Sequence, residues 1–311
     1  KMANKIIFMG TPIFCVPILK SLYQNGYNIS VVFTQPPQKS HRGQKINKSP
    51  IQGISETLNI DYRTPKTLKD NHEEYEFLKE LNADLAIVCA YGQIIPENFL
   101  NLTKKGFVNI HASILPSWRG AAPIQRSIMN LDLETGISIM KIKKELDSGP
   151  VSNIYKIKID QNQNAQEISE KLSALAAEKI LDNVDDILED KAKFIDQDHS
   201  KATYAKKIDK EESRIDWDED ASKIIGKING LFPSPGASFS FNGERYKILK
   251  AEIGNGIGQV GEIISNQLEV ACNKNQSIKI LEIQRQGKRP QKISEFMLGS
   301  QIKKGSKLSN V

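Results

Sequence analysis

Short apolar runs alternate with amphipathic stretches through the first half of the chain. Helices are expected from about Phe14 to Asn25, where Gly26 ends the pattern, and from about Ala121 onward. The apolar runs, each short enough for one buried strand, lie at residues 5–10, 28–36, 84–92, 106–112 and 135–142. This order predicts an α/β fold with a doubly wound, mostly parallel, Rossmann-like sheet that carries helices on both faces. Ligands of such sheets bind beyond the carboxyl ends of the strands.

The second half of the chain has a different pattern. A strand at 151–160 and a long amphipathic helix at 165–189 are followed by residues 191–206, which are polar and lack a period. A helix-like segment at 222–232 then precedes short β-like runs at residues 236–242, 244–253, 259–265, 267–273 and 277–285. Asn242-Gly243 is a hairpin signal. These features predict a domain at 2–190, a linker at 191–206, and a small β-barrel domain of the oligonucleotide-binding (OB) type at 207–311.

Composition fits a globular cytoplasmic protein. The 311 residues are 39% hydrophobic and 26% charged, and no run approaches the roughly 20 apolar residues of a membrane helix. No signal peptide is apparent. The three cysteines are far apart and show no metal-ligand spacing, so neither a disulfide framework nor a metal site is expected.

Positive charge is concentrated in two regions. Residues 221–311 carry 14 Lys and Arg against 6 Asp and Glu, and residues 1–55 contain no acid. Within the latter, a Pro- and Gly-rich segment presents Arg42, Lys45 and Lys48. Such asymmetry favours a polyanionic partner, although an ordinary solvated surface remains an alternative.

The first strand does not lead into a dinucleotide-binding loop. Gly10-Thr11-Pro12 lacks the later glycines of G-x-G-x-x-G, and Pro12 has no N–H to offer a phosphate. Gly10 is therefore interpreted as part of a tight turn between strand and helix.

A histidine and an asparagine share one face of the fourth apolar run. Asn109 and His111 are two residues apart and lie at the carboxyl end of the predicted strand. The sequence SILPSWRGAAP follows, and its prolines and glycine indicate a shaped loop. A core histidine bonded to a backbone carbonyl is the alternative, and the pairing with Asn109 leaves the two interpretations about even.

Asp147 lies in a Gly- and Pro-containing turn, where an aspartate is usually a turn former. If its carboxylate meets His111, it would orient the imidazole and favour the cation. The imidazole and the Asn109 amide could then both donate to one developing oxyanion, which suits acyl transfer to an amine that is itself the nucleophile.

These motifs resemble those of the methionyl-tRNA formyltransferases, a family of 10-formyltetrahydrofolate-dependent formyltransferases. The resemblance rests on NIHASILPSWRGAAPIQR, ELDSGP, TPIFCVP and TQPPQKSHRGQK, and extends to YAKKIDKEESRIDW in the second domain. The chain departs from the family pattern at Ser117, where a basic residue is frequent.

The resemblance implies a role for each matched position. Asn109, His111 and Asp147 would be catalytic, Phe14 would hold the methionine side chain, and Arg42, Lys45 and Lys48 would contact the acceptor stem of tRNA. The folate pocket would comprise Cys89, Ala90, Tyr91, Gly92, Ser113, Ile114, Leu115 and Pro116. The implied partners are initiator methionyl-tRNA and 10-formyltetrahydrofolate as co-substrate, without a metal, and the implied state is a monomer in the cytoplasm.

Two alternatives remain open on the sequence. A folate-dependent formyltransferase that acts on a sugar amine or a glycinamide nucleotide would share Asn109, His111 and Asp147 but would not need the basic regions. A non-catalytic RNA-binding protein on the same fold would need the basic regions but not the three polar residues.

Overall fold

The computed structural model of the chain describes residues 3–40, 43 and 45–309. The chain forms two compact units. The N-terminal unit comprises residues up to Gly120 together with 136–157 and 169–204, and the C-terminal unit comprises 121–135, 158–168 and residues from Ala205 onward.

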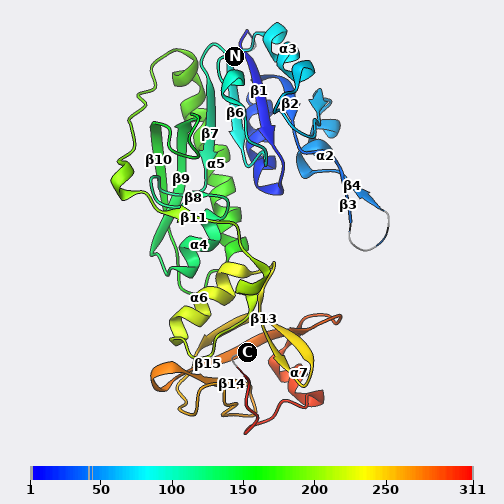
Figure 1. Ribbon diagram of the computed structural model, residues 1–311, viewed down its shortest axis with the longest axis vertical. Coiled ribbons are helices and arrows are strands. Elements are labelled where there is room, and N and C mark those ends of the chain that lie inside the picture. The colour runs from blue at the N-terminus through cyan, green and yellow to red at the C-terminus, as the bar shows by residue number, and fades with distance from the viewer. Residues whose placement is uncertain (1–2, 41–42, 44, 310–311) are drawn as a thin grey trace. The chain divides into compact units, whose positions relative to one another are not determined.

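Figure 1 shows how the helices and strands are arranged along the chain. The strands are β1 (Lys5–Gly10), β2 (Asn28–Phe33), β3 (Gln38–Lys39), β4 (Ile46–Asn47), β5 (Tyr62–Arg63), β6 (Leu85–Cys89), β7 (Phe107–His111), β8 (Arg119–Gly120), β9 (Glu134–Lys141), β10 (Val151–Lys158), β11 (Tyr204–Ala205), β12 (Ala237–Phe241), β13 (Glu244–Ile253), β14 (Glu269–Cys272), β15 (Gln276–Arg285) and β16 (Gln291–Lys292). The α-helices are α1 (Val16–Gln24), α2 (Pro50–Thr57), α3 (His72–Leu81), α4 (Pro123–Met129), α5 (Ala165–Leu188), α6 (Ala221–Leu231) and α7 (Ile293–Gly299).

The large sheet has seven strands in the order β10-β9-β7-β6-β1-β2-β5. The pairs β5–β2, β2–β1, β1–β6 and β6–β7 are parallel, whereas β9 runs antiparallel to β7. The prediction of a mostly parallel sheet is therefore confirmed.

Helices cover both faces of this sheet, as expected of a doubly wound fold. On one face, Leu78 of α3 packs with Ile7, Met9 and Phe33. On the other, α1 is tied to α5 by the Ser21 hydroxyl, which donates to the Ala177 carbonyl at 2.6 Å. Successive residues of β1 are buried because their side chains point alternately into these two layers.

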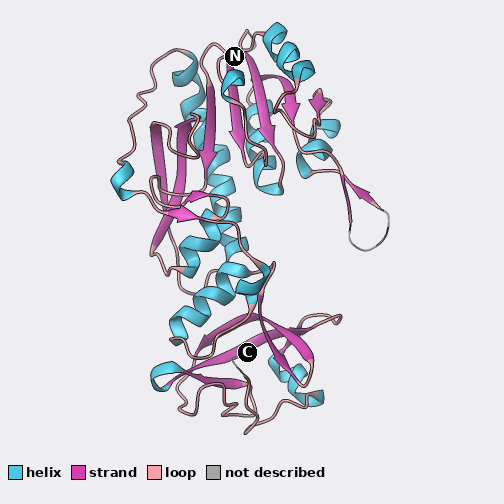
Figure 2. Ribbon diagram, viewed as in Figure 1, coloured by secondary structure: helices cyan, strands magenta, loops and turns pink. Residues whose placement is uncertain are grey.

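The C-terminal unit contains a five-stranded antiparallel sheet in the order β12-β13-β15-β14, with β16 on β15 (Figure 2). Its core includes Trp217, Phe239 and Tyr246, and the rings of Phe239 and Tyr246 stack with centroids 5.3 Å apart. The predicted antiparallel strands are confirmed, and closure into an OB barrel stays a prediction.

One predicted hairpin of this unit forms as expected, whereas one predicted strand does not form. Asn242 and Gly243 both have positive φ, 49° and 76°, and join β12 to β13 in the expected hairpin. The strand expected at 259–265 is wrong: only Glu262 and Ile263 form isolated bridges there. The segment follows a glycine-rich stretch, and its backbone hydrogen bonds are divided between β14 and a loop near the C-terminus. The Ile264 N–H donates to the Glu269 carbonyl at 2.9 Å, and the Ile263 N–H donates to the Ser306 carbonyl at 2.8 Å.

A two-point ion pair within the C-terminal unit makes its stability depend on pH. Arg126 donates through both terminal nitrogens to Glu212, at 2.5 and 3.0 Å. The Arg126 hydrogen bond lowers the pKa of Glu212 from 4.5 to about 2, so the stabilisation is full above pH 4.5 and is lost as the pH falls toward 2.

We therefore expect Glu212→Gln to lower the free energy of unfolding at pH 7 by about 2 kcal/mol, and by much less near pH 2. Thermal unfolding followed across this pH range measures the difference. Glu211→Gln, an exposed neighbour, is the matched control. An equal loss for Glu212→Gln at both pH values would contradict the prediction.

Candidate functional site

The carboxyl ends of three neighbouring strands form the floor of the candidate site. Gly10 is in register with Cys89 on β6, and Val88 is in register with Asn109 on β7. Beyond the strands, the Thr11 hydroxyl donates to the Tyr91 carbonyl at 2.7 Å. A Cβ on Gly10 would lie 2.9 Å from the Cys89 carbonyl oxygen, which explains why a tight turn with glycine occurs here.

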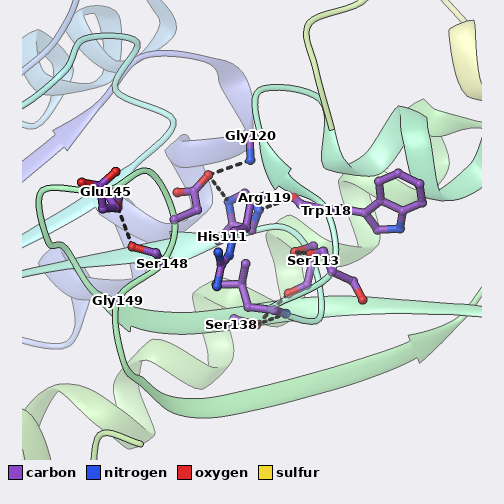
Figure 3. A network of polar contacts seen from close by, with 12 residues as sticks. His111, Ser113, Trp118, Arg119, Gly120, Ser138, Glu145, Ser148 and Gly149 are labelled. Carbon is purple, nitrogen blue, oxygen red and sulfur yellow. Dashed lines mark hydrogen bonds and ion pairs between the residues drawn. The ribbon is translucent and has the colours of Figure 1, made fainter. Parts of the chain in front are cut away.

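Asn109 and His111 both lie on this edge, as predicted. Asn109 is half-buried, and its carboxamide makes no hydrogen bond to any described residue. His111 is 6% exposed, and its Nε2 lies 2.8 Å from the Trp118 carbonyl oxygen (Figure 3). Because a carbonyl can only accept, Nε2 carries a proton.

Asp147 reaches the other side of the imidazole. Its Oδ2 lies 3.7 Å from His111 Nδ1 and accepts a hydrogen bond from the Gly120 N–H at 2.8 Å. The Asp147 residue is 8% exposed, and its φ of 51° is left-handed, which is uncommon for a residue with a side chain. The structure thus brings the three predicted polar residues to one edge and pairs His111 with Asp147.

The geometry refines how His111 could act. A core histidine bound to a carbonyl and a functional histidine were alternatives on the sequence, and His111 combines both features: Nε2 is bound to the main chain while Nδ1 faces a carboxylate. Nδ1 can therefore donate to a developing oxyanion only when it also carries a proton.

The loop after β7 is braced by a buried serine. Ser138 Oγ on β9 donates to the Ser113 carbonyl at 2.7 Å and accepts from the Leu115 N–H at 3.1 Å. Leu115-Pro116 is a cis peptide bond, and Trp118 has a φ of 60°. The hydrogen bonds of Ser138 hold the start of the turn that brings the Trp118 carbonyl back to His111.

The residues predicted to form the folate pocket differ in exposure. Cys89, Tyr91, Ser113 and Leu115 are buried, Ile114 and Pro116 are half-buried, and Ala90 and Gly92 are exposed. Ala90 and Gly92 both have positive φ, at 47° and 91°. At Ala90 and Gly92, where the side chain is a methyl group or absent, the exposed surface is thus largely main chain.

A buried thiol at the end of β6 and a buried phenol in the loop after it both stay protonated at neutral pH. A hydrogen bond with Cys15, and then burial, hold the pKa of the Cys89 thiol well above its ordinary value. Burial, and then the negative charge of Glu74, raise the pKa of the Tyr91 hydroxyl. Neither a thiolate nor a phenolate is therefore expected at these positions at neutral pH.

The remaining predicted positions belong to the same unit. Phe14 is half-buried, and its carbonyl accepts from the Ser173 hydroxyl at 2.7 Å. Lys45 and Lys48 are exposed at the β3–β4 hairpin, and Lys48 Nζ lies 2.9 Å from Glu56. Arg42 lies outside the described residues.

Sequence reasoning missed several residues that support the site. The supporting groups are Trp118, Gly120, Ser138 and Gln197. Gln197 is 8% exposed although it falls in the segment expected to be a linker. A buried polar residue in a polar stretch carries no periodic signal, so the pattern could not reveal it.

Within the described ranges, no group of three or more His, Cys, Asp or Glu residues could hold a metal ion. No helix among the described residues has the length and apolar character needed to cross a membrane.

Sequence comparison identifies the relatives of the chain. The family described as "Formyl transferase" matches residues 4–184, and "Formyl transferase, C-terminal domain" matches residues 207–301. A methionyl-tRNA formyltransferase of Pelagibacter ubique is 66% identical over 310 residues, with 100% of each chain covered. A methionyl-tRNA formyltransferase of Mesorhizobium japonicum is 40% identical, with 99% of this chain and 100% of the relative covered.

Structure comparison finds the same fold in more distant proteins. WlaRD, a sugar 3N-formyl transferase solved with dTDP and 5-N-formyl-THF, superposes with a TM-score of 0.69 at 19% identity, covering 93% of this chain and all of that chain. At this identity the likeness concerns the fold alone.

Proposed function

The chain belongs to the methionyl-tRNA formyltransferase family, and from this premise we propose that it transfers the formyl group of 10-formyltetrahydrofolate to the α-amine of methionyl initiator tRNA. The observation that carries the proposal is that Asn109, His111 and Asp147 lie together at one edge of the sheet in a member of this family. The product would serve translation initiation.

The neutral amine attacks the formyl carbon, and negative charge develops on the formyl oxygen. When the tetrahedral intermediate collapses, the bond from the formyl carbon to N10 of the folate breaks, and N10 leaves with the proton that the amine has lost, which gives tetrahydrofolate. Asn109 is suited to stabilise this oxyanion because its carboxamide N–H groups have no other partner among the described residues. No enzyme nucleophile is required, because the amine itself attacks.

His111 and Asp147 act as a pair in this reaction. The Trp118 carbonyl fixes the ring through Nε2, and Asp147 lies beside Nδ1, which can donate to the oxyanion when it carries a proton. Asp147 also assists removal of the proton that the attacking amine loses.

The folate co-substrate would lie against the loops after β6 and β7. Gly92 and Ala90 expose main chain there, while Ile114 and Pro116 offer half-buried apolar surface. Such a combination suits a flat heterocycle with polar edges. Phe14 would contact the methionine side chain.

The tRNA would bind through the two basic regions. Lys45 and Lys48 are exposed beside Arg42 in sequence, and residues 221–311 carry the positive excess. We assign residues 2–190 to formyl transfer, 191–206 to a linker and 207–311 to tRNA binding, in a cytoplasmic monomer. Neighbouring phosphates would then be neutralised by lysine and arginine.

The β3–β4 hairpin permits a graded test of tRNA binding. Lys48 is partly neutralised by Glu56, whose pKa its hydrogen bond lowers, whereas Lys45 has no ion-pair partner among the described residues. We expect Lys45→Ala to weaken tRNA binding more than Lys48→Ala, and to reduce the slope of log affinity against log salt by about 0.7–0.9. Titrations at several salt concentrations measure both effects. Equal effects of the two variants, or an unchanged salt slope, would count against this assignment.

A formyl-transfer assay tests the function itself. Purified protein is mixed with 10-formyltetrahydrofolate and methionyl initiator tRNA, with methionyl elongator tRNA, a sugar amine and glycinamide ribonucleotide in parallel. Formylation of initiator tRNA alone is expected. Formylation of a small amine instead would keep the chemistry and overturn the acceptor, and RNA binding without transfer would overturn the enzymatic proposal.

A further inference from the structure

The turn that carries Asp147 is held from behind by one buried amide. Gln197 Nε2 donates to the carbonyl oxygens of Asp147, at 2.9 Å, and of Gly149, at 2.8 Å. Both protons of the carboxamide are therefore used on the two sides of Ser148. Because Gln197 is buried, water does not compete for these bonds.

Arg119 fixes the orientation of that amide. Its Nε and Nη2 donate to Gln197 Oε1 at 3.2 and 2.9 Å, and the arginine is 5% exposed. Nη2 also lies 2.8 Å from His199 Nδ1, which must accept because a guanidinium only donates. The oxygen of the Gln197 amide is thus assigned to Arg119, which leaves the nitrogen to face the turn.

These contacts close a ring around the catalytic carboxylate. Gly120, the residue after Arg119, donates its N–H to Asp147 Oδ2, while Arg119 holds Gln197 and Gln197 holds the Asp147 carbonyl. The side chain of Asp147 is therefore tied to β8 (Arg119–Gly120) through the Gly120 N–H. Its backbone is tied to the same strand through Gln197 and Arg119. His111 faces the same Oδ2.

Asp147 needs such support because its backbone is left-handed. A φ of 51° is a conformation that residues with a Cβ rarely adopt. Without bonds to the carbonyls on each side of Ser148, the turn can relax, and the carboxylate would move away from His111. A displacement of about 1 Å can reduce a rate by about 100-fold.

We propose that Gln197 is a positioning residue for formyl transfer, which holds the Asp147 turn so that its carboxylate stays against His111. The inference rests on the proposed function for its kinetic consequence. Gln197 touches neither substrate nor reacting atoms, and its whole effect passes through Asp147.

Two substitutions remove the N–H donors of the Gln197 side chain in different ways. Gln197→Glu keeps an acceptor for Arg119 but replaces the donating nitrogen with an oxygen that repels the two carbonyls. Gln197→Met removes the hydrogen bonds without adding charge. Each should lower kcat by about 10–100-fold and change the KM values for tRNA and folate little. Asn183→Leu is the matched control, because Asn183 is a buried amide of the same unit that binds Tyr155 and the Lys179 carbonyl instead.

A double-mutant cycle separates positioning from general damage. In the Asp147→Asn background, measured in single turnovers, a second change at Gln197 should cost little further rate. Additive losses in the cycle, or a kcat within about twofold of the parent for both Gln197 variants, would overturn the inference.

Amide hydrogen exchange at Gly120 tests the clamp without any activity. This N–H is held by Asp147, so its exchange should accelerate by about tenfold in both Gln197 variants and stay unchanged in Asn183→Leu. Unchanged exchange at Gly120 would refute the clamp. A parent protein that formylates no amine would refute the proposed function while leaving this measurement to decide the clamp.

Discussion

Asn109→Ala should lower kcat for formyl transfer by about 10²–10³-fold while leaving the affinity for tRNA nearly unchanged. The carboxamide lies at the carboxyl end of β7, half-buried and without a partner among the described residues. A donor of this kind stabilises charge that exists only in the transition state and the tetrahedral intermediate. Its loss therefore appears in kcat rather than in the binding of either substrate.

The measurement is steady-state kinetics with both substrates varied, together with tRNA titrations. Asn98→Ala is the matched control, because Asn98 is an exposed asparagine of the same unit in the short helix Glu97–Phe99. His111→Ala should produce a comparable loss, and the double variant should lose less than the product of the two, since both donors serve one oxygen. A kcat for Asn109→Ala within about tenfold of the parent would show that the amide is no oxyanion donor.

The fold could be read from the sequence because its signals are local and repeated. Buried strands such as β1 and β6 are continuous apolar runs, and the Asn242-Gly243 pair specifies its own turn geometry. The direction of β9 carries no such signal. It depends on the path of the loop and helix between β7 and β9, and its residues are buried whichever way it runs.

Part of the candidate site could also be predicted, because it too depends on local sequence spacing. The spacing of Asn109 and His111 on a strand places both at one edge. The Trp118 carbonyl that binds His111 was not predictable, because Trp118 has a φ of 60° and is not itself a glycine, the residue that usually marks such a backbone. Gln197 was hidden in a polar stretch, and only tertiary contacts distinguish it from a solvated residue.

Gly149→Ala, which adds a single methyl group, should destabilise the protein more than any other glycine-to-alanine substitution in the N-terminal unit. A Cβ at this position would overlap the Lys141 carbonyl oxygen and lie 2.9 Å from the Lys141 carbonyl carbon. Both atoms are main chain of β9, so no side-chain rotation can relieve the overlap. The turn that contains Gly149 must therefore move away from β9. That movement would break the hydrogen bond that the Lys141 N–H donates to the Pro150 carbonyl at 2.9 Å in the parent protein.

The displaced turn is the one that presents Asp147, two residues earlier, and that Gln197 holds through the Gly149 carbonyl. We expect the variant to lose about 3 kcal/mol or more of unfolding free energy, at the upper end of overpacking costs, and any folded fraction to lose at least about 100-fold in kcat. Thermal unfolding and kinetics on the purified variant measure both quantities.

Gly53→Ala provides the matched comparison, since Gly53 lies in α2 and a Cβ added there would meet no atom of the described residues within 4 Å. There the same methyl group should raise stability by up to about 1 kcal/mol through helix propensity. A melting temperature for Gly149→Ala within about 2 °C of the parent, with kcat preserved, would mean that the β9 backbone yields freely. That outcome would contradict a rigid turn between β9 and Asp147, and with it the expectation that the Gln197 amide holds this turn in one position.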